Sequence, residues 1–412
     1  MTLQTIKTIL ILSFILNEAF DWYLDYLDTK HMNAAVPENV RDVYNKEEYE
    51  KWISYHKDNK RLGILMQAVS FLVSLVMLVF SLHAFVFRMF EGKPVYLQYF
   101  CAIVLFSMIT TLVSIPFQYY DTFVIEEKYG MNKTTLKTFI LDMIKSWVIS
   151  TVLMFALISL IMFLYERFGD SGIVLICAAF ILISLVFSMI AVPLMRIFNK
   201  FVPLEDGELK DALLALCDKY GVQVKKIIVR DASRRTTKAN AFCTGITKKK
   251  TISLDDNLVE DYDKEQIVAV FAHEFAHAKY RHILKSLPFS LAQTVLTIVM
   301  MGIIFHILPA FEAFGFTGVN YYFAMTLLNM LTWPLSRGLE CVACQISRKH
   351  EYEADAFAAR EGYGEALISA LKKLSKDSLS NLNPHPLIVK LMYSHPTLSQ
   401  RIEAIESKCL TS

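Results

Sequence analysis

Two histidines and a glutamate within five consecutive residues match a zinc-binding pattern. His273 and His277 are four positions apart, so on a helix both imidazoles share one face and can bind the same Zn²⁺ ion. Glu274 lies one residue further round the helix, where its carboxylate can polarise a water molecule at the metal's open position. This spacing predicts a zinc site equipped for hydrolysis. A helix that merely carries two histidines is the alternative on this motif alone.

A zinc ion held by two histidines needs a third protein ligand, and a second acidic pair can supply it. Glu351 and Asp355 are also four positions apart, on a partly apolar helical face, where two carboxylates are costly unless a cation satisfies them. We predict that Glu351 is the third ligand and that Asp355 orients a ligand imidazole. A solvated acidic helix face, favoured by the nearby Glu353 and Glu361, is the alternative.

Composition places these motifs in a membrane protein. The chain of 412 residues is 54% hydrophobic and only 20% charged, and its apolar residues gather in long runs. About seven runs are long enough to cross the hydrocarbon core of a bilayer. These predicted spans are Thr5–Trp22, Leu62–Phe87, Leu97–Tyr119, Ile144–Tyr165, Gly172–Met195, Leu287–Phe311 and Tyr321–Leu339.

The distribution of charge predicts how the chain is oriented. Lys and Arg gather in the loops after the first and third spans, in the segment after the fifth span and in the C-terminal tail. By the positive-inside rule, the metal motif and the C-terminus face the cytoplasm and the N-terminus lies outside. We read the first span as an uncleaved anchor rather than a signal peptide, because no small-residue cleavage site follows it. The net charge of +2 gives no reason to expect nucleic acid.

The segment between the fifth and sixth spans is polar and contains the metal motif. Glu208–Tyr220 has the pattern of an amphipathic helix, and Val224–Val229 reads as a short strand. Ala239–Ile246 and Thr251–Leu254 are predicted to be two strands joined by a lysine-rich turn, Thr247–Lys250. We therefore divide the chain into four parts. Residues 1–195 contain the first five spans with their cytoplasmic loops, and residues 196–286 form a cytoplasmic metalloprotease segment with the β-hairpin and the metal-motif helix. Residues 287–340 contain the sixth and seventh spans, and residues 341–412 form a C-terminal helical segment with the third ligand.

Together these motifs resemble a known protein family. HEFAH followed by Lys279 and His282, then SRKHEYEADAFA, then Tyr393–Pro396 and Arg401, are similar to the zinc-dependent CAAX prenyl endopeptidase family of integral membrane proteases. The resemblance covers most of the chain. It includes Phe123–Lys133, in the loop after the third span, and Pro203–Leu209, at the entry to the polar segment.

The resemblance implies a role for several residues. The ligands would be His273, His277 and Glu351 around one Zn²⁺ per chain, and Glu274 would be the general base. The implied fold is an all-α membrane protein whose roughly seven helices form a chamber, joined to a zincin-like part with a small β-sheet. The substrate would lie extended along an edge strand, and two further residues would stabilise the tetrahedral intermediate. The residues matching these last roles are Asn240, Ala241 and Phe242 for the strand, and His395 and Arg401 for the intermediate.

Some positions depart from the family or keep more than one interpretation. Ala276 and Ala278 stand where the family usually has Gly and Trp, which puts substrate preference in more doubt than zinc binding. His282 follows His277 by five residues, off the ligand face, so a role behind a ligand or on the surface is expected. His350 and His385 are expected to be solvated. Cys341 and Cys344 read as buried small residues rather than a redox or metal pair.

The leading hypothesis is a zinc endopeptidase that hydrolyses a peptide or prenylated peptide. A membrane quality-control protease without prenyl specificity is the close alternative. A transporter or channel with a structural metal is less favoured, because no span carries paired charges or a broken-helix pattern. We expect a monomer in contact with membrane lipid. The membrane would be the endoplasmic reticulum in a eukaryote and the cytoplasmic membrane in a bacterium.

Overall fold

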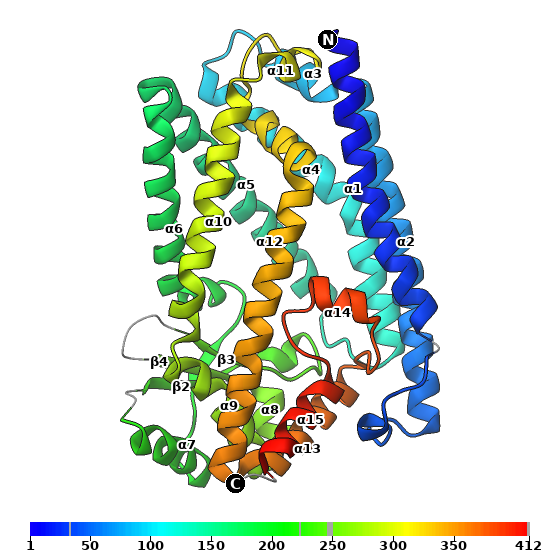
Figure 1. The fold of residues 1–412 in the computed structure, drawn as a ribbon, viewed down its shortest axis with the longest axis vertical. Helices are drawn as coiled ribbons and strands as arrows, with labels where there is room; N and C mark the ends of the chain where they lie inside the picture. The colour runs from blue at the N-terminus through cyan, green and yellow to red at the C-terminus, as the bar shows by residue number, and fades with distance from the viewer. Residues whose placement is uncertain (33, 222–223, 245–249, 410–412) are drawn as a thin grey trace.

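Long helices stand side by side and carry a smaller part of short helices and strands at one end (Figure 1). The computed structural model describes residues 1–32, 34–221, 224–244 and 250–409. The two termini lie at opposite ends of the long axis (Figure 1). The long helices are α1 (Leu3–His31), α2 (Lys46–Val79), α4 (Val95–Tyr120), α5 (Leu136–Phe168), α6 (Ser171–Met195), α10 (His282–Phe305) and α12 (Tyr321–Ala358).

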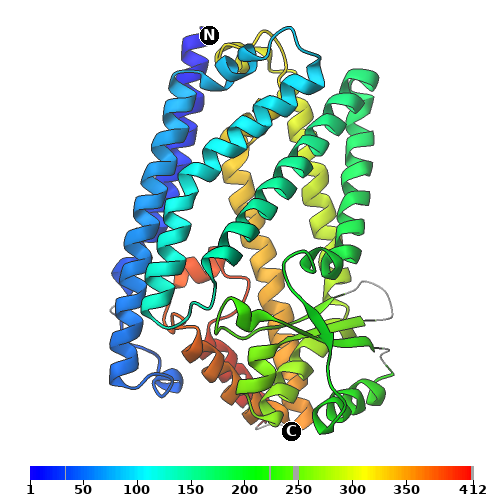
Figure 2. The ribbon, with the colours of Figure 1, turned by 180° about the vertical axis from the view of Figure 1, so that it is seen from behind.

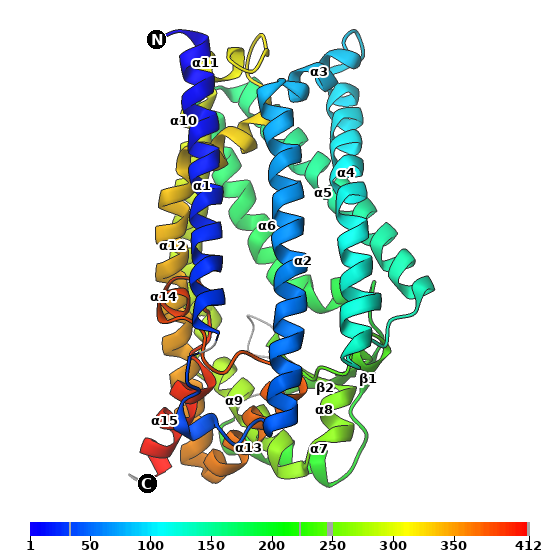
Figure 3. The ribbon, with the colours of Figure 1, turned by 90° about the vertical axis from the view of Figure 1, so that its right-hand side faces the viewer.

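Five helices within the described residues are long and apolar enough to cross a membrane. They are α1, α2, α4 with its π-helical continuation Asp121–Glu126, α5 and α10, and they correspond to five of the predicted spans. The predicted span Gly172–Met195 falls on α6 (Ser171–Met195), and Tyr321–Leu339 falls on α12. Seven crossings therefore remain a prediction. In Figure 3, α1, α2 and α4 run side by side along the long axis.

Two predicted spans extend beyond the end of the helix that each one matches. Leu62–Phe87 continues past Val79, where α2 ends, because Ser81 adopts a left-handed conformation with φ of 54° and the chain turns into α3 (Leu82–Met89). Leu287–Phe311 continues past the end of α10, after which the short helix α11 (Leu308–Glu312) begins with Pro309 in its first turn. Both breaks lie at the end of the bundle far from the metal motif (Figure 1).

The smaller part combines a four-stranded sheet with short helices. The strands follow the order β1-β2-β4-β3, with β2 and β4 parallel and the other pairs antiparallel. Figure 2 shows this sheet below the ends of α5 and α6. The elements are β1 (Phe201–Pro203), α7 (Glu208–Lys219), β2 (Val224–Arg230), β3 (Ala241–Thr244), β4 (Lys250–Asp255), α8 (Asp256–Asp261), α9 (Lys264–Lys279), α13 (Gly364–Asp377), α14 (Pro386–Met392) and α15 (Leu398–Cys409).

The predicted amphipathic helix and the three predicted strands of the polar segment are confirmed as α7, β2, β3 and β4. β3 pairs with β4 in register Phe242↔Ser253 and lies at the end of the sheet, so one of its edges has no neighbouring strand among the described strands. Three residues of the predicted turn Thr247–Lys250, 247–249, lie outside the described residues.

The metal-motif helix α9 is held in the core of the smaller part. Its start is fixed by a capping box, in which Asp263 and Gln266 each cap the other's backbone N–H group. Nearly every residue from Gln266 to Ala278 is buried, so packing surrounds the helix on almost all sides. Phe275 is fully buried and lies 5.9 Å, centroid to centroid, from Phe357 of α12. This contact ties the two helices that carry the predicted metal ligands.

We expect Phe275→Ala to destabilise the protein by about 3–5 kcal/mol, because it leaves a cavity between α9 and α12. The midpoint of thermal unfolding in detergent measures the loss. Phe275→Leu fills more of the space and should lose less. An unchanged midpoint in the Ala variant would show that this contact does not hold the two helices.

Candidate metal centre

Three predicted ligands from two helices converge on one point. The Nε2 atoms of His273 and His277 lie 3.3 Å apart, on adjacent turns of α9. Glu351 reaches them from α12, with one carboxylate oxygen 3.3 Å from His273 Nε2 and the other 3.4 Å from His277 Nε2. One donor atom from each residue lies within 4.8 Å of the other two, a spacing that suits three ligands of one ion.

The buried carboxylate of Glu351 fits a metal ligand. Its Oε2 atom is buried and has no hydrogen-bond partner among the described residues. An unsatisfied buried carboxylate oxygen is costly, and a divalent cation at the convergence point would satisfy it. Two neutral imidazoles with one carboxylate are the donor set of many catalytic zinc sites, which keep a fourth position open. The residues present therefore fit a zinc ion.

His273 is oriented from behind by Asp355. The Nδ1 atom of His273 lies 2.8 Å from Asp355 Oδ1, so its Nδ1–H group donates to the carboxylate and leaves Nε2 free to face the metal. Arg401 of α15 donates to both oxygens of Asp355, at 2.9 and 2.7 Å. Asp355 is only 1% exposed and the Arg401 side chain 12%, so the solvated-face alternative is wrong.

His277 is contacted from behind by another histidine. The Nδ1 atoms of His277 and His282 lie 2.9 Å apart, and His282 is buried. His350, expected to be solvated, is also buried, because its ring stacks on His282 with centroids 4.2 Å apart. That expectation was wrong because His350 lies on the side of α12 that faces the start of α10.

The surroundings of the three ligands shift their protonation in different directions. Burial opposes the charged form of His273, but the hydrogen bond to Asp355 and the nearby carboxylate of Glu351 outweigh it and raise the pKa to about 9. Burial, with the positive charge of His273, lowers the pKa of His277 to about 3. Although burial opposes ionisation of Glu351, its close contact with the charged ring of His273 lowers its pKa to about 2. A metal ion that binds here therefore displaces a proton from the cluster.

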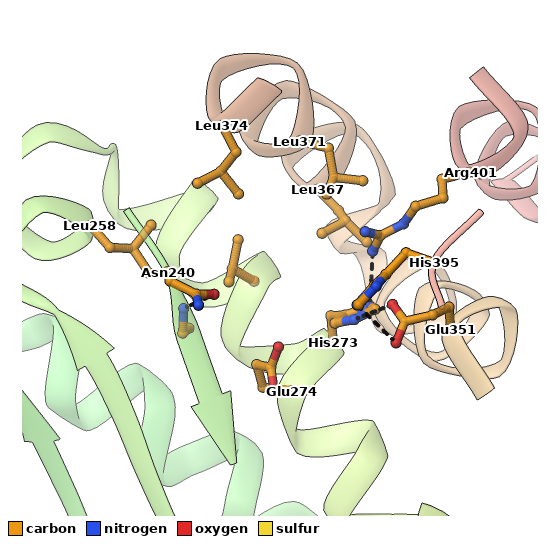
Figure 4. Close-up of a pocket in the computed structure, with 12 residues that line it drawn as sticks. Asn240, Leu258, His273, Glu274, Glu351, Leu367, Leu371, Leu374, His395 and Arg401 are labelled. Carbon is orange, nitrogen blue, oxygen red and sulfur yellow. Dashed lines mark hydrogen bonds and ion pairs between the residues drawn. The ribbon is translucent and has the colours of Figure 1, made fainter. Parts of the chain in front are cut away.

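A cavity of about 140 Å³ opens beside two of the predicted ligands, His273 and Glu351 (Figure 4). Glu274 lines it on the side that faces the edge strand β3, and Asn240, next to the start of β3, lines it on the same side (Figure 4). Ala241 also lines the cavity. His395 is 62% exposed, and its Nε2 atom lies 3.5 Å from a Glu351 oxygen. Arg401 also lines the cavity while its guanidinium holds Asp355.

The structure thus brings most of the predicted site residues to one place. His277 and Asp355 do not line the cavity, but both contact His273. Phe242 lies apart from the cluster, with the centre of its ring 5.6 Å from the guanidinium carbon of Arg230.

Apolar residues that sequence reasoning missed complete the cavity wall. Three leucines of α13 line it at helical spacing, with further side chains from α8 and α9. On its own, a stripe of leucines on an amphipathic helix is typical of ordinary core packing, so only the folded arrangement distinguishes it. These residues are Leu258, Val270, Leu367, Leu371 and Leu374.

Comparisons with known proteins match both parts of the chain. Residues 25–200 match a family model described as CAAX prenyl protease N-terminal, five membrane helices, and residues 203–408 match peptidase family M48. CAAX prenyl protease 1 of Saccharomyces cerevisiae is 32% identical, over 94% of this chain and 92% of the yeast protein. The CAAX prenyl protease 1 homolog of Arabidopsis thaliana is 31% identical, over 93% and 94%. A crystal structure of S. mikatae Ste24p superposes with a TM-score of 0.90 at 31% identity, covering 97% of this chain and 99% of that one.

Proposed function

The chain belongs to peptidase family M48 and is a membrane metalloendopeptidase of the CAAX prenyl protease type, and we propose that its catalytic metal is one zinc ion held by His273, His277 and Glu351. The convergence of these three side chains, two of them buried, carries the proposal. When bound there, zinc supplies Lewis acidity, which polarises a peptide carbonyl and lowers the pKa of a water molecule.

Glu274 is proposed as the general base. It follows a ligand directly on α9 and lines the same cavity, so its carboxylate can take a proton from the attacking water and pass it to the leaving amine. His395 lines the cavity from the segment before α15, where its imidazole can donate to a carbonyl oxygen that gains negative charge. Arg401 adds a fixed positive charge nearby and holds Asp355 in place.

The substrate is a peptide, and we propose that it binds as an added strand along β3. Asn240 and Ala241 lie at the start of this edge strand and form a wall of the cavity, so an extended peptide paired there would pass beside Glu274. The leucines of α13 supply an apolar surface opposite, which suits aliphatic side chains. A prenylated peptide end is the proposed class, in line with the yeast and Arabidopsis relatives.

The protein is an integral multi-pass membrane protein, and we propose that its metal centre faces the cytoplasm. Lys and Arg are concentrated in the loops at the end of the molecule that holds the metal centre. The termini at opposite ends of the long axis agree with an odd number of crossings.

Metal analysis tests the ligand set. Purified wild-type protein is expected to contain about one zinc per chain, and His277→Ala is expected to lose it because two ligands do not hold zinc against a chelator. His385→Ala is the matched control, since His385 caps α14 outside the cluster. Full zinc occupancy in His277→Ala would overturn the ligand assignment.

A further inference from the structure

A second histidine stands directly behind a proposed ligand. The Nδ1 atom of His282 lies 2.9 Å from Nδ1 of His277, on the opposite side of the ring from the convergence point. His282 is 3% exposed, so no bulk water competes for this contact. On its other side, Nε2 of His282 lies 3.2 Å from a carboxylate oxygen of Glu353.

The fold places His282 there by breaking the helix. On a continuous helix, a residue five positions on would lie about 140° around the axis from His277. Instead α9 ends at Lys279, and Arg281 adopts a left-handed conformation with φ of 55°. The chain therefore turns before α10 begins at His282 and brings this side chain back to the ring of His277.

Counting protons fixes the direction of each hydrogen bond. If Nε2 of His277 gives its lone pair to the metal, the single ring proton of the neutral imidazole is on Nδ1. The hydrogen bond to His282 then requires an acceptor at Nδ1 of His282, so the proton of that ring is on Nε2. The carboxylate of Glu353 accepts a hydrogen bond from this Nε2–H group, and Nζ of Lys285 donates to the same oxygen at 3.2 Å. Each donor therefore meets an acceptor along the chain from Glu353 to His277.

We propose that His282 is a positioning residue that accepts the Nδ1–H of His277, with Glu353 fixing the proton of His282, so that Nε2 of His277 is held toward the metal. This inference rests on the proposed zinc site. The result is a pair of supports: a carboxylate behind His273 and a histidine–carboxylate pair behind His277. Such partners fix the tautomer and ring orientation of a ligand, and their loss typically weakens metal binding about 10- to 100-fold.

Two substitutions of His282 distinguish a role as hydrogen-bond acceptor from a role in packing. His282→Phe keeps a ring against His350 but removes the acceptor. His282→Asn loses the ring but places an amide oxygen where Nδ1 stood. The zinc dissociation constant, measured by competition with a chelator, is expected to rise about 10- to 100-fold in His282→Phe and only a few-fold in His282→Asn. A packing role predicts the opposite order.

A double-mutant cycle tests the part played by Glu353. Without the carboxylate of Glu353, the ring proton of His282 can move to Nδ1, which then no longer accepts the Nδ1–H group of His277. Zinc binding is therefore expected to weaken in Glu353→Ala when the rest of the protein is wild type. In the His282→Asn background the same substitution is expected to have no effect, because no tautomer remains to be fixed. His350→Phe is the matched control, since it keeps the ring stacked on His282 and gives up a ring-nitrogen contact with Ser286. Its dissociation constant is expected to match that of the wild type.

The comparison among variants tests this inference separately from the ligand set, which the wild-type zinc content and His277→Ala already test. Thermal unfolding of the metal-free variants checks that all are folded, and Glu353→Ala provides a test at a partly exposed site if His282→Phe does not fold. Wild-type affinity in His282→Phe, or equally weak binding in His282→Phe and His282→Asn, would overturn the positioning role. So would a Glu353→Ala effect that persists in the Asn background.

Discussion

In the Glu274→Gln variant, hydrolysis of a peptide substrate is expected to fall by at least about a hundredfold while zinc stays bound. The amide fills the space of the carboxylate, so the cavity and the three ligands keep their arrangement. It cannot take a proton from water at neutral pH, and the attacking water then lacks its base. Turnover of a prenylated peptide and metal analysis of the same preparation measure the two properties.

A matched substitution on the same helix serves as the control. Glu265 lies in the first turn of α9, exposed and outside the cavity, so Glu265→Gln changes the same charge without touching the site. Its activity is expected to equal that of the wild type. If Glu274→Gln kept activity within a few-fold of wild type, another group would be the base.

Glu351→Ala and Asp355→Ala are expected to differ although both residues lie on one face of α12. Glu351→Ala removes a proposed ligand, so zinc and activity are both lost at any practical zinc concentration. Asp355→Ala removes no proposed ligand but takes away the acceptor behind His273, which costs about 10- to 100-fold in affinity. Excess zinc is therefore expected to restore measurable activity to Asp355→Ala but not to Glu351→Ala.

The buried position of Asp355 calls for one more variant. Asp355→Ala leaves the Arg401 guanidinium without its carboxylate in a buried place, which destabilises the protein for a reason unrelated to zinc. Asp355→Asn keeps an oxygen for His273 and for Arg401, so it is expected to bind zinc better than Asp355→Ala. Identical behaviour of the Glu351 and Asp355 variants, or a greater loss at Asp355, would mean that the two roles are exchanged.

Much of the candidate site could be predicted from the spacing of residues along two helices. His273 and His277 share a face because of the helical repeat alone, and the same repeat placed Glu351 and Asp355 together. Which carboxylate faces the ligands was not fixed by spacing, since both lie on the same face. Family resemblance chose Glu351, and in the structure it is Glu351 that lies beside both Nε2 atoms.

Contacts that depend on a break in regular structure were not decided by the sequence. For His282 two roles stayed open, one behind a ligand and one on the surface, because a continuous helix turns this residue away from the ligand face. The left-handed Arg281 redirects the chain and places His282 behind His277. The membrane helices were identified by the length of their apolar runs. The left-handed conformation of Ser81, which follows the end of α2, could not be predicted in this way, because the apolar run continues past it. The leucines of α13 that line the cavity could not be recognised for a different reason. Leucines in a core and leucines that line a cavity both recur at helical spacing along an amphipathic helix.

The proposed ligands come from α9 and α12, which precede and follow α10 along the chain, and this fixes when the centre can form during synthesis. α9 is made before α10 and α12, so the nascent chain carries both histidines before the carboxylate of Glu351 exists. On the proposed ligand set, catalysis therefore begins only after Glu351 has been synthesised and α12 has packed against α9, so the unfinished chain is inactive.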